Sequence, residues 1–151
     1  MSVYAFVFPG QGSQSVGMGL ALSEAFGIAR EVFQEVDDAL GDHLSKLMFS
    51  GEPATLTRTE NAQPALMAVS MATLRVLESE GGFTLADKAA LVAGHSLGQS
   101  SALAAAGSVG TAPAARLLRS RGEAPQRSGP ADAGGPAAPL GLVLASARCV
   151  R

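Results

Sequence analysis

The amino-acid sequence predicts an α/β fold built around a parallel sheet. Two short apolar runs, residues 3–8 and 89–93, have the composition of buried strands. Between them, and again after the second run, apolar residues recur at helical spacing. The order strand, helices, strand, helix is typical of a parallel sheet, because parallel strands need a crossover connection that is usually a helix.

The first strand is expected over residues 3–8, VYAFVF, a β-branched and aromatic run that Pro9 and Gly10 end. A continuously apolar strand is typical of one covered on both faces, so we expect it near the centre of the sheet. Residues 26–42 then place apolar side chains at helical spacing, with acidic residues turned elsewhere. They predict an amphipathic helix that Gly41 ends.

A long helix is expected over residues 60–80, where apolar positions keep helical spacing for about five turns. Pro64 fits only in the first turn of that helix, and the pair Gly81–Gly82 ends it. After the second strand, two alanine-rich helices are expected at residues 97–106 and 112–122.

The composition changes beyond residue 123. Residues 124–151 hold four of the eight prolines and seven alanines, and neither the helix period nor the strand period is sustained there. We therefore assign residues 1–123 to the N-terminal part of one domain and residues 124–151 to an atypical tail. Two explanations stay open for the tail, a flexible terminal segment and a shifted reading frame in GC-rich coding sequence.

Composition excludes several classes of function. A chain of 151 residues can bury a sizeable core, and 47% hydrophobic against 16% charged residues excludes a disordered acidic or basic chain. The net charge of −2 gives no nucleic-acid footprint. A single cysteine excludes an internal disulfide framework. Without a secretion signal or an apolar run long enough for a membrane span, we expect a soluble cytoplasmic protein.

Residues 94–99, GHSLGQ, place a serine between two glycines directly after the second strand. A strand that turns sharply into a helix strains the residue at the turn and requires small residues two positions away on either side. Gly94 and Gly98 occupy those positions. The pattern G-x-S-x-G between a strand and a helix is the nucleophile elbow, so Ser96 is the candidate nucleophile.

The loop after the first strand, FPGQGSQSVGMG at residues 8–19, is rich in glycine. A dinucleotide fingerprint would need glycine where Ser15 stands, and a Walker loop would need a lysine, yet the first lysine is Lys46. We expect an oxyanion hole instead, with the N–H groups of Leu97 and Gln11 as its donors. The alternative for Gln11 is an ordinary polar turn residue.

Three ordered motifs carry a resemblance: FVFPGQGSQ near the start, TENAQPAL at residues 59–66 and AGHSLGQSSALAAAG at residues 93–107. Together they resemble malonyl-CoA:acyl carrier protein transacylases of bacterial fatty-acid synthesis, and more distantly the acyltransferase domains of polyketide synthases. The resemblance covers residues 1–123. It implies the first portion of an α/β-hydrolase-like large subdomain, with the ferredoxin-like small subdomain absent from this chain.

The resemblance implies ping-pong acyl transfer without a metal or other cofactor. Ser96 takes malonyl from malonyl-CoA as an ester, and the phosphopantetheine thiol of acyl carrier protein then removes it. Gln11 and Leu97 match the oxyanion-hole donors, and Gln63 matches a glutamine that lines the pocket.

Arg121 matches the arginine that pairs with the free malonyl carboxylate. A planar guanidinium offers that carboxylate two parallel charge-assisted hydrogen bonds. The alternative is a solvent-facing helix arginine, as we expect for the nearby Arg116 and Arg119.

The sequence departs from the family pattern at the base. The family uses a histidine far downstream of the elbow, whereas this chain has only His95, part of the elbow motif, and His43, expected on the surface. Gln99 stands where the family usually carries glutamate, and Ser100 replaces a common aromatic residue. We therefore expect a truncated chain with impaired activity.

Two alternative functions stay open. A serine esterase or thioesterase would use the same elbow with water as the acceptor. A non-catalytic module would hold coenzyme A or carrier protein without turnover. Arg121 distinguishes the transferase from an esterase for neutral acyl groups, which should be indifferent to it. An incomplete sheet also leaves an unpaired edge and an uncovered apolar face, so we expect self-association.

Overall fold

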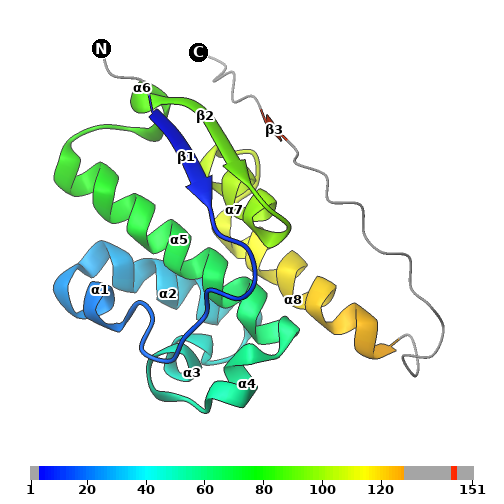
Figure 1. Ribbon diagram of the computed structural model, residues 1–151. Coiled ribbons are helices and arrows are strands. Elements are labelled where there is room, and N and C mark those ends of the chain that lie inside the picture. The colour runs from blue at the N-terminus through cyan, green and yellow to red at the C-terminus, as the bar shows by residue number, and fades with distance from the viewer. Residues whose placement is uncertain (1–3, 128–143, 146–151) are drawn as a thin grey trace.

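The computed structural model describes residues 4–127 and 144–145. The elements follow in the order β1 (Tyr4–Phe8), α1 (Leu20–Ala25), α2 (Gly27–Leu40), α3 (Leu44–Ser50), α4 (Pro53–Thr57), α5 (Thr59–Gly81), α6 (Leu85–Lys88), β2 (Ala89–Gly94), α7 (Leu97–Ala105), α8 (Thr111–Arg127) and β3 (Leu144–Ala145). The predicted α/β class is confirmed, although helices make up most of the described chain (Figure 1).

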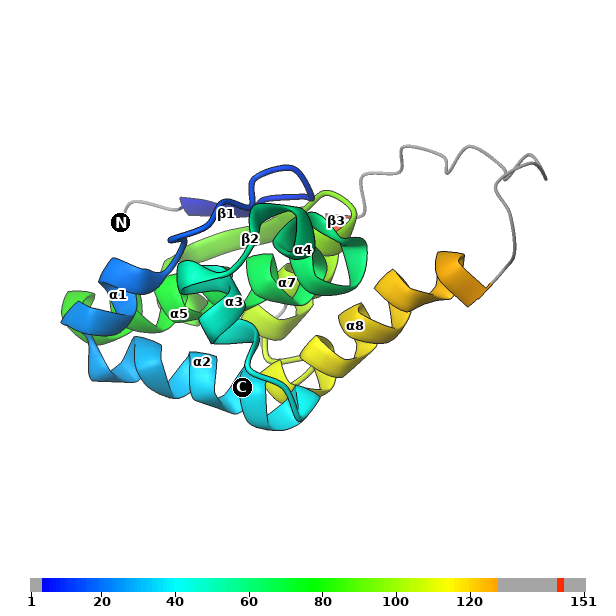
Figure 2. The same cartoon turned by 90° about the horizontal axis from the view of Figure 1, so that it is seen from below.

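The described elements form layers. α5 and α7 lie beneath one face of the sheet, and α2 and α8 form a further layer beyond them (Figure 2). α5 contacts both α2 and α8, so it forms the centre of the helical layers. Its residues 61–68 are all buried, which explains why a single apolar stripe does not describe this half of the helix.

β1 and β2 pair in parallel, from Tyr4 opposite Ala89 to Phe8 opposite Gly94, which confirms the predicted parallel pair. The order of strands is β1-β2-β3, and β3 runs antiparallel to β2. The expectation that the first strand lies centrally and is covered on both faces is wrong for the described sheet, because β1 is its edge. Val7 on this strand is 74% exposed.

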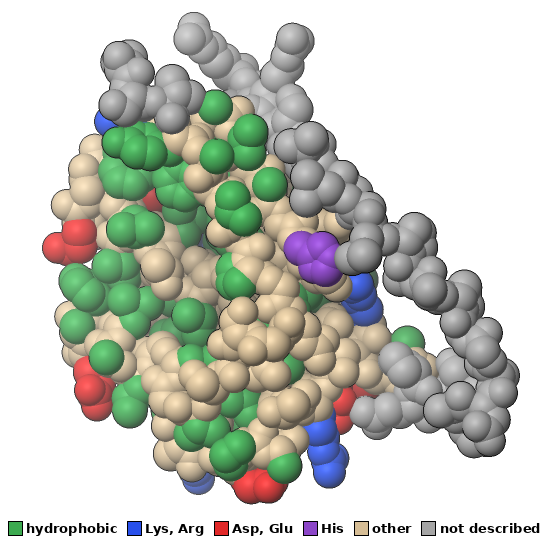
Figure 3. Space-filling view, viewed as in Figure 1, with side chains coloured by type: hydrophobic (Ala, Val, Ile, Leu, Met, Phe, Trp, Pro, Cys, Tyr) green, Lys and Arg blue, Asp and Glu red, His purple; other side chains and the backbone are tan. Residues whose placement is uncertain are grey.

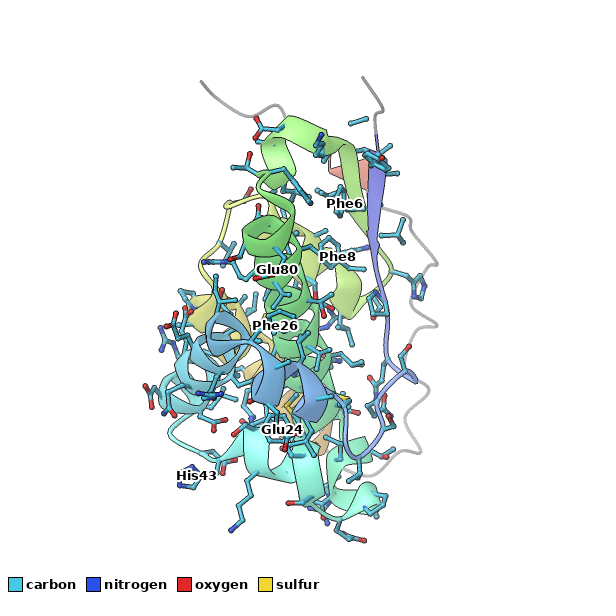
Figure 4. The ribbon with its side chains drawn as sticks, turned by 90° about the vertical axis from the view of Figure 1, so that its left-hand side faces the viewer. Phe6, Phe8, Glu24, Phe26, His43 and Glu80 are labelled. Atoms are coloured by element: carbon cyan, nitrogen blue, oxygen red, sulfur yellow. The ribbon has the colours of Figure 1, made fainter. Side chains whose placement is uncertain are left out.

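The exposure of β1 has a simple cause in the placement of the helices. Phe6 and Phe8 point from β1 toward α5 (Figure 4), and Phe8 is buried. Val7 points to the opposite face because strand side chains alternate, and no described helix covers that face. Apolar side chains accordingly gather over β1 and α5 in Figure 3.

The longer helices match the predicted ranges closely. Gly41 and Gly82 cap α2 and α5 at their C-terminal ends in the left-handed conformation, as predicted. Pro64 does not lie in the first turn of its helix. It is the sixth residue of α5, where it removes a backbone donor at a cost of about 3 kcal/mol. The ring is fully buried, so the packing of this helix offsets that cost.

Four short helices, α1, α3, α4 and α6, were not predicted, and α8 runs beyond residue 122 to Arg127. The proposed boundary at residue 123 therefore falls inside a helix, while residues 128–143 and 146–151 of the predicted tail lie outside the described residues. No helix in the described ranges is both long and apolar enough to cross a membrane.

The open face of β1 generates a prediction about association. Val7→Lys places a charge on the open face of the edge strand β1, and a charge on an edge strand disfavours its pairing with another copy of the chain, so the weight-average mass from light scattering should fall toward that of the monomer. Leu117→Lys on α8 is the matched control, because Leu117 is also exposed, at 60%, but lies away from the sheet. Equal effects of the two changes would contradict a role for the strand edge.

Candidate active site

Ser96 stands at a sharp reversal of the chain between β2 and α7. β2 ends at Gly94, α7 begins at Leu97, and Ser96 between them has φ 55° and ψ −116°. Within the described ranges, no other non-glycine residue has a positive φ. Such a conformation costs about 1–3 kcal/mol and persists only where surrounding structure holds it. The predicted strained turn from strand to helix is confirmed.

The two glycines around Ser96 are required by close backbone packing. A Cβ atom added to Gly98 would lie 2.5 Å from the carbonyl oxygen of Phe8 and 2.9 Å from that of Pro9. A Cβ atom on Gly94 would overlap the carbonyl group of Gly98. The predicted need for small residues at both positions is therefore confirmed, and at Gly98 its cause is the close approach of the end of β1 to the start of α7.

Arg121 on α8 reaches the hydroxyl group of Ser96. The Nη2 atom of Arg121 donates a hydrogen bond to Oγ of Ser96 at 3.3 Å. A guanidinium carries five N–H donors, so this bond leaves donors for a second acceptor such as a carboxylate. The alternative of an arginine that only faces solvent does not describe this contact.

Leu97 is the first residue of α7. Its N–H group has no acceptor within the helix and lies at the positive end of the helix dipole. The next two N–H groups, of Gly98 and Gln99, donate to the carbonyls of His95 and Ser96 at 2.9 Å and 3.1 Å. This arrangement is compatible with an oxyanion donor at Leu97, and that role stays a prediction.

The loop after β1 lies against the elbow. A Cβ atom on Gly10 would lie 3.2 Å from the carbonyl oxygen of His95. The next residue, Gln11, donates a hydrogen bond from Nε2 to the Thr59 hydroxyl at 3.3 Å. The side chain of Gln11 therefore ties the loop to the start of α5, while its backbone role at the oxyanion stays a prediction.

The end of α8 packs on the start of α5. A Cβ atom on Gly122 would lie 2.5 Å from the backbone nitrogen of Glu60 and 2.8 Å from the carbonyl carbon of Thr59. Gly122 directly follows Arg121 in the sequence, so this contact fixes the backbone from which the guanidinium extends.

Arg119 holds the same part of α8. Its Nη1 donates to Oδ1 of Asn61 at 2.8 Å, and its Nη2 forms an ion pair with Asp42 at 3.3 Å. Its side chain is only 19% exposed. The expectation of a solvent-facing arginine at 119 is therefore wrong, because the turn after α2 and the start of α5 both supply acceptors. Arg116 is exposed, as expected.

These contacts link the elbow, α8, α5 and the loop after β1 into one connected group of segments. Ser96 contacts the end of α8, the end of α8 packs on the start of α5, the start of α5 binds the loop after β1, and that loop lies against the elbow. The contribution of Thr59, Gly122 and Arg119 to these contacts was not predicted from the sequence. The available signals were the position of Thr59 at the start of the TENAQPAL motif and the glycine next to Arg121.

Gln63 lies one helical turn after Thr59, hence on the same side of α5. It is 5% exposed, and its Oε1 atom has no hydrogen-bond partner among the described residues. Leaving such an acceptor unpaired costs about 1–3 kcal/mol, so a donor on a ligand or a neighbouring group would be favourable there. The predicted role of Gln63 in lining a pocket is compatible with this.

Neither histidine forms a hydrogen bond with Ser96 among the described residues. His43 precedes α3 and is exposed, as expected (Figure 4), and His95, directly before Ser96, is exposed as well. The described ranges also hold no group of acidic, histidine or cysteine side chains that could bind a metal ion. Hydrogen bonds from the Thr84 hydroxyl and N–H lower the pKa of Asp87, which lies in α6 directly before the start of β2, whereas Ser96 follows the end of that strand.

A family model described as the acyl transferase domain matches residues 5–144. The chain belongs to the acyltransferase family. The family resemblance predicted from the three motifs is thereby confirmed, and the match extends into the region assigned to the tail.

The curated relatives of this acyltransferase chain include one protein of Bacillus subtilis and one of Escherichia coli, to which the chain is compared in turn. It is 46% identical over 100 residues to the malonyl CoA-acyl carrier protein transacylase of Bacillus subtilis, covering 62% of this chain and 32% of that protein. It is 43% identical over 96 residues to the same-named protein of Escherichia coli K12, covering 64% of this chain and 30% of that protein. The chain thus spans about a third of the length of these relatives.

Solved structures give the same comparison for the acyltransferase fold. The acyl-carrier-protein-S-malonyltransferase of Bartonella henselae aligns with a TM-score of 0.79 at 57% identity, covering 83% of this chain and 40% of that one. A type II polyketide synthase acyl carrier protein in complex with its malonyl-transacylase aligns with a TM-score of 0.78 at 43% identity, covering 85% and 40%.

The glycine packing at the elbow generates a stability prediction. Gly98→Ala pushes a methyl group against the carbonyls of Phe8 and Pro9, so we expect the free energy of unfolding to fall by about 1–3 kcal/mol in urea titrations. Gly27→Ala is the control, because a Cβ atom there meets nothing within 4 Å and alanine favours the first turn of α2. An unchanged urea midpoint for Gly98→Ala would show that the elbow tolerates a wider approach.

Proposed function

We propose that this chain carries the nucleophile of a malonyl transferase. Ser96 accepts a malonyl group from malonyl-CoA as an ester, and the phosphopantetheine thiol of acyl carrier protein removes it, in cytoplasmic fatty-acid synthesis. Malonyl-CoA is a substrate here, and no metal or other cofactor takes part. The names of the relatives in Bacillus subtilis and Escherichia coli support this choice of substrate and partner.

The contact between Arg121 and Ser96 is the observation that carries the proposal. The guanidinium lies 3.3 Å from the nucleophilic oxygen, measured from Nη2 to Oγ. In a malonyl thioester one methylene group separates the reacting carbonyl from the free carboxylate. A cation that close to the nucleophile is therefore positioned to bind the carboxylate of an acyl group in which the carboxylate is only one methylene group away from the reacting carbonyl.

The proposal also assigns a role to each of the other site residues. The N–H groups of Gln11 and Leu97 stabilise the oxyanion of the tetrahedral intermediate, and Gln63 lines the acyl pocket. The family base is a downstream histidine, and His43 and His95 do not bond to Ser96 in the described structure. We therefore propose that the chain forms the malonyl ester slowly.

The proposal is tested by incubating the protein with malonyl-CoA and measuring intact mass. We expect one malonyl group per chain, mapped to Ser96 by peptide mass spectrometry and absent from Ser96→Ala. Wild-type protein with no adduct would favour a non-catalytic binding module. An adduct that water removes faster than holo acyl carrier protein does would favour a thioesterase.

Arg121→Ala tests the choice of acyl group. Loss of the charge-assisted bonds to the carboxylate should slow malonyl ester formation about 10- to 100-fold and favour acetyl-CoA over malonyl-CoA, as measured by competing the two thioesters. Arg116→Ala, an exposed arginine on the same helix, is the matched control and should leave the ratio unchanged. Equal loss of both substrates in Arg121→Ala would contradict carboxylate recognition.

A further inference from the structure

We infer that Arg121 also activates the nucleophile itself, by stabilising the Ser96 alkoxide through its hydrogen bond to Oγ, whatever acyl group is present. This role rests on Ser96 being the nucleophile of the proposed function. It differs from carboxylate recognition because it requires no charge on the substrate. It makes Arg121 a catalytic residue at both ends of the reacting acyl group.

The geometry supports a charge effect on the oxygen. The donor in the bond of 3.3 Å is a guanidinium nitrogen, and a guanidinium carries a delocalised positive charge and only donates hydrogen bonds. A fixed positive charge at that distance favours the anionic form of its acceptor over the neutral hydroxyl. Arg121 is exposed, so water screens the interaction, and the effect should depend on salt.

The backbone that carries Arg121 is held on both sides of this residue. Gly122 packs on the backbone of Glu60, and Arg119, two residues before Arg121, binds Asn61 and Asp42. A positive charge that extends from a fixed backbone and already bonds Oγ needs less reorganisation as negative charge develops on Oγ, and preorganised charges stabilise transition states effectively.

The inference can be tested with phenylmethanesulfonyl fluoride, a neutral reagent without a carboxylate. In the expected step the Ser96 hydroxyl proton passes to hydroxide from solvent, giving water. The alkoxide Oγ attacks sulfur, the S–F bond breaks, fluoride leaves, and Ser96 carries the sulfonyl ester. The rate of labelling at constant pH is followed by intact mass, with Ser96→Ala as the background.

The charge is removed with Arg121→Gln and kept with Arg121→Lys. We expect Arg121→Gln to label about threefold to tenfold more slowly than wild type, and Arg121→Lys to recover part of the loss. Arg116→Gln removes the same charge from an exposed site on the same helix and should label at the wild-type rate. Raising the salt concentration should slow the wild type but leave Arg121→Gln unchanged.

Several results would overturn the inference. They are wild-type labelling no faster than the Ser96→Ala background, Arg121→Gln labelling at or above the wild-type rate, and an equal loss in Arg116→Gln. Equal losses in Arg121→Lys and Arg121→Gln with a salt-independent wild-type rate would assign the effect to side-chain shape, which also overturns it. If labelling depends on the charge but malonyl-CoA gives no adduct, the proposed transfer fails and this role of Arg121 stands. If malonyl-CoA gives the adduct but labelling does not depend on the charge, this role fails and the proposed transfer stands.

Discussion

The contact between the end of β1 and the start of α7 is the constraint on which the site depends. Gly98 brings the helix backbone onto the carbonyls of Phe8 and Pro9, and this contact holds Ser96 in its strained conformation. The same contact brings the loop after β1 beside the elbow. One close approach of two backbones therefore sets the direction of the hydroxyl and the position of the loop that faces it.

The parts of the fold that could be predicted from the sequence are those with local causes. The elbow follows from the spacing of Gly94, Ser96 and Gly98, and the ends of α2 and α5 follow from glycine caps. The short helices were missed because segments of four to seven residues carry too few periodic positions to be distinguished from loops. The central position expected for β1 failed because composition reports a tendency to be buried and cannot report which elements supply the cover.

In the site, too, features with local causes could be predicted from the sequence and contacts between distant residues could not. Ser96 could be predicted from its own motif, whereas the place of Arg121 came from resemblance, because no local pattern links residues 25 positions apart. Arg119, two positions earlier on the same helix, was expected to face solvent. Instead it supports the helix by binding Asp42 and Asn61, while Arg121 contacts Ser96.

Gly122 shows how a missing side chain can determine the reach of its neighbour. Helix α8 can lie against the start of α5 only because hydrogen occupies the place of a methyl group at this residue. This close contact between the two helices fixes the position of the Arg121 backbone, and the long side chain of Arg121 spans the remaining distance to Ser96. The distance between Arg121 and Ser96 is thus set by the smallest residue of the helix as much as by the long side chain next to it.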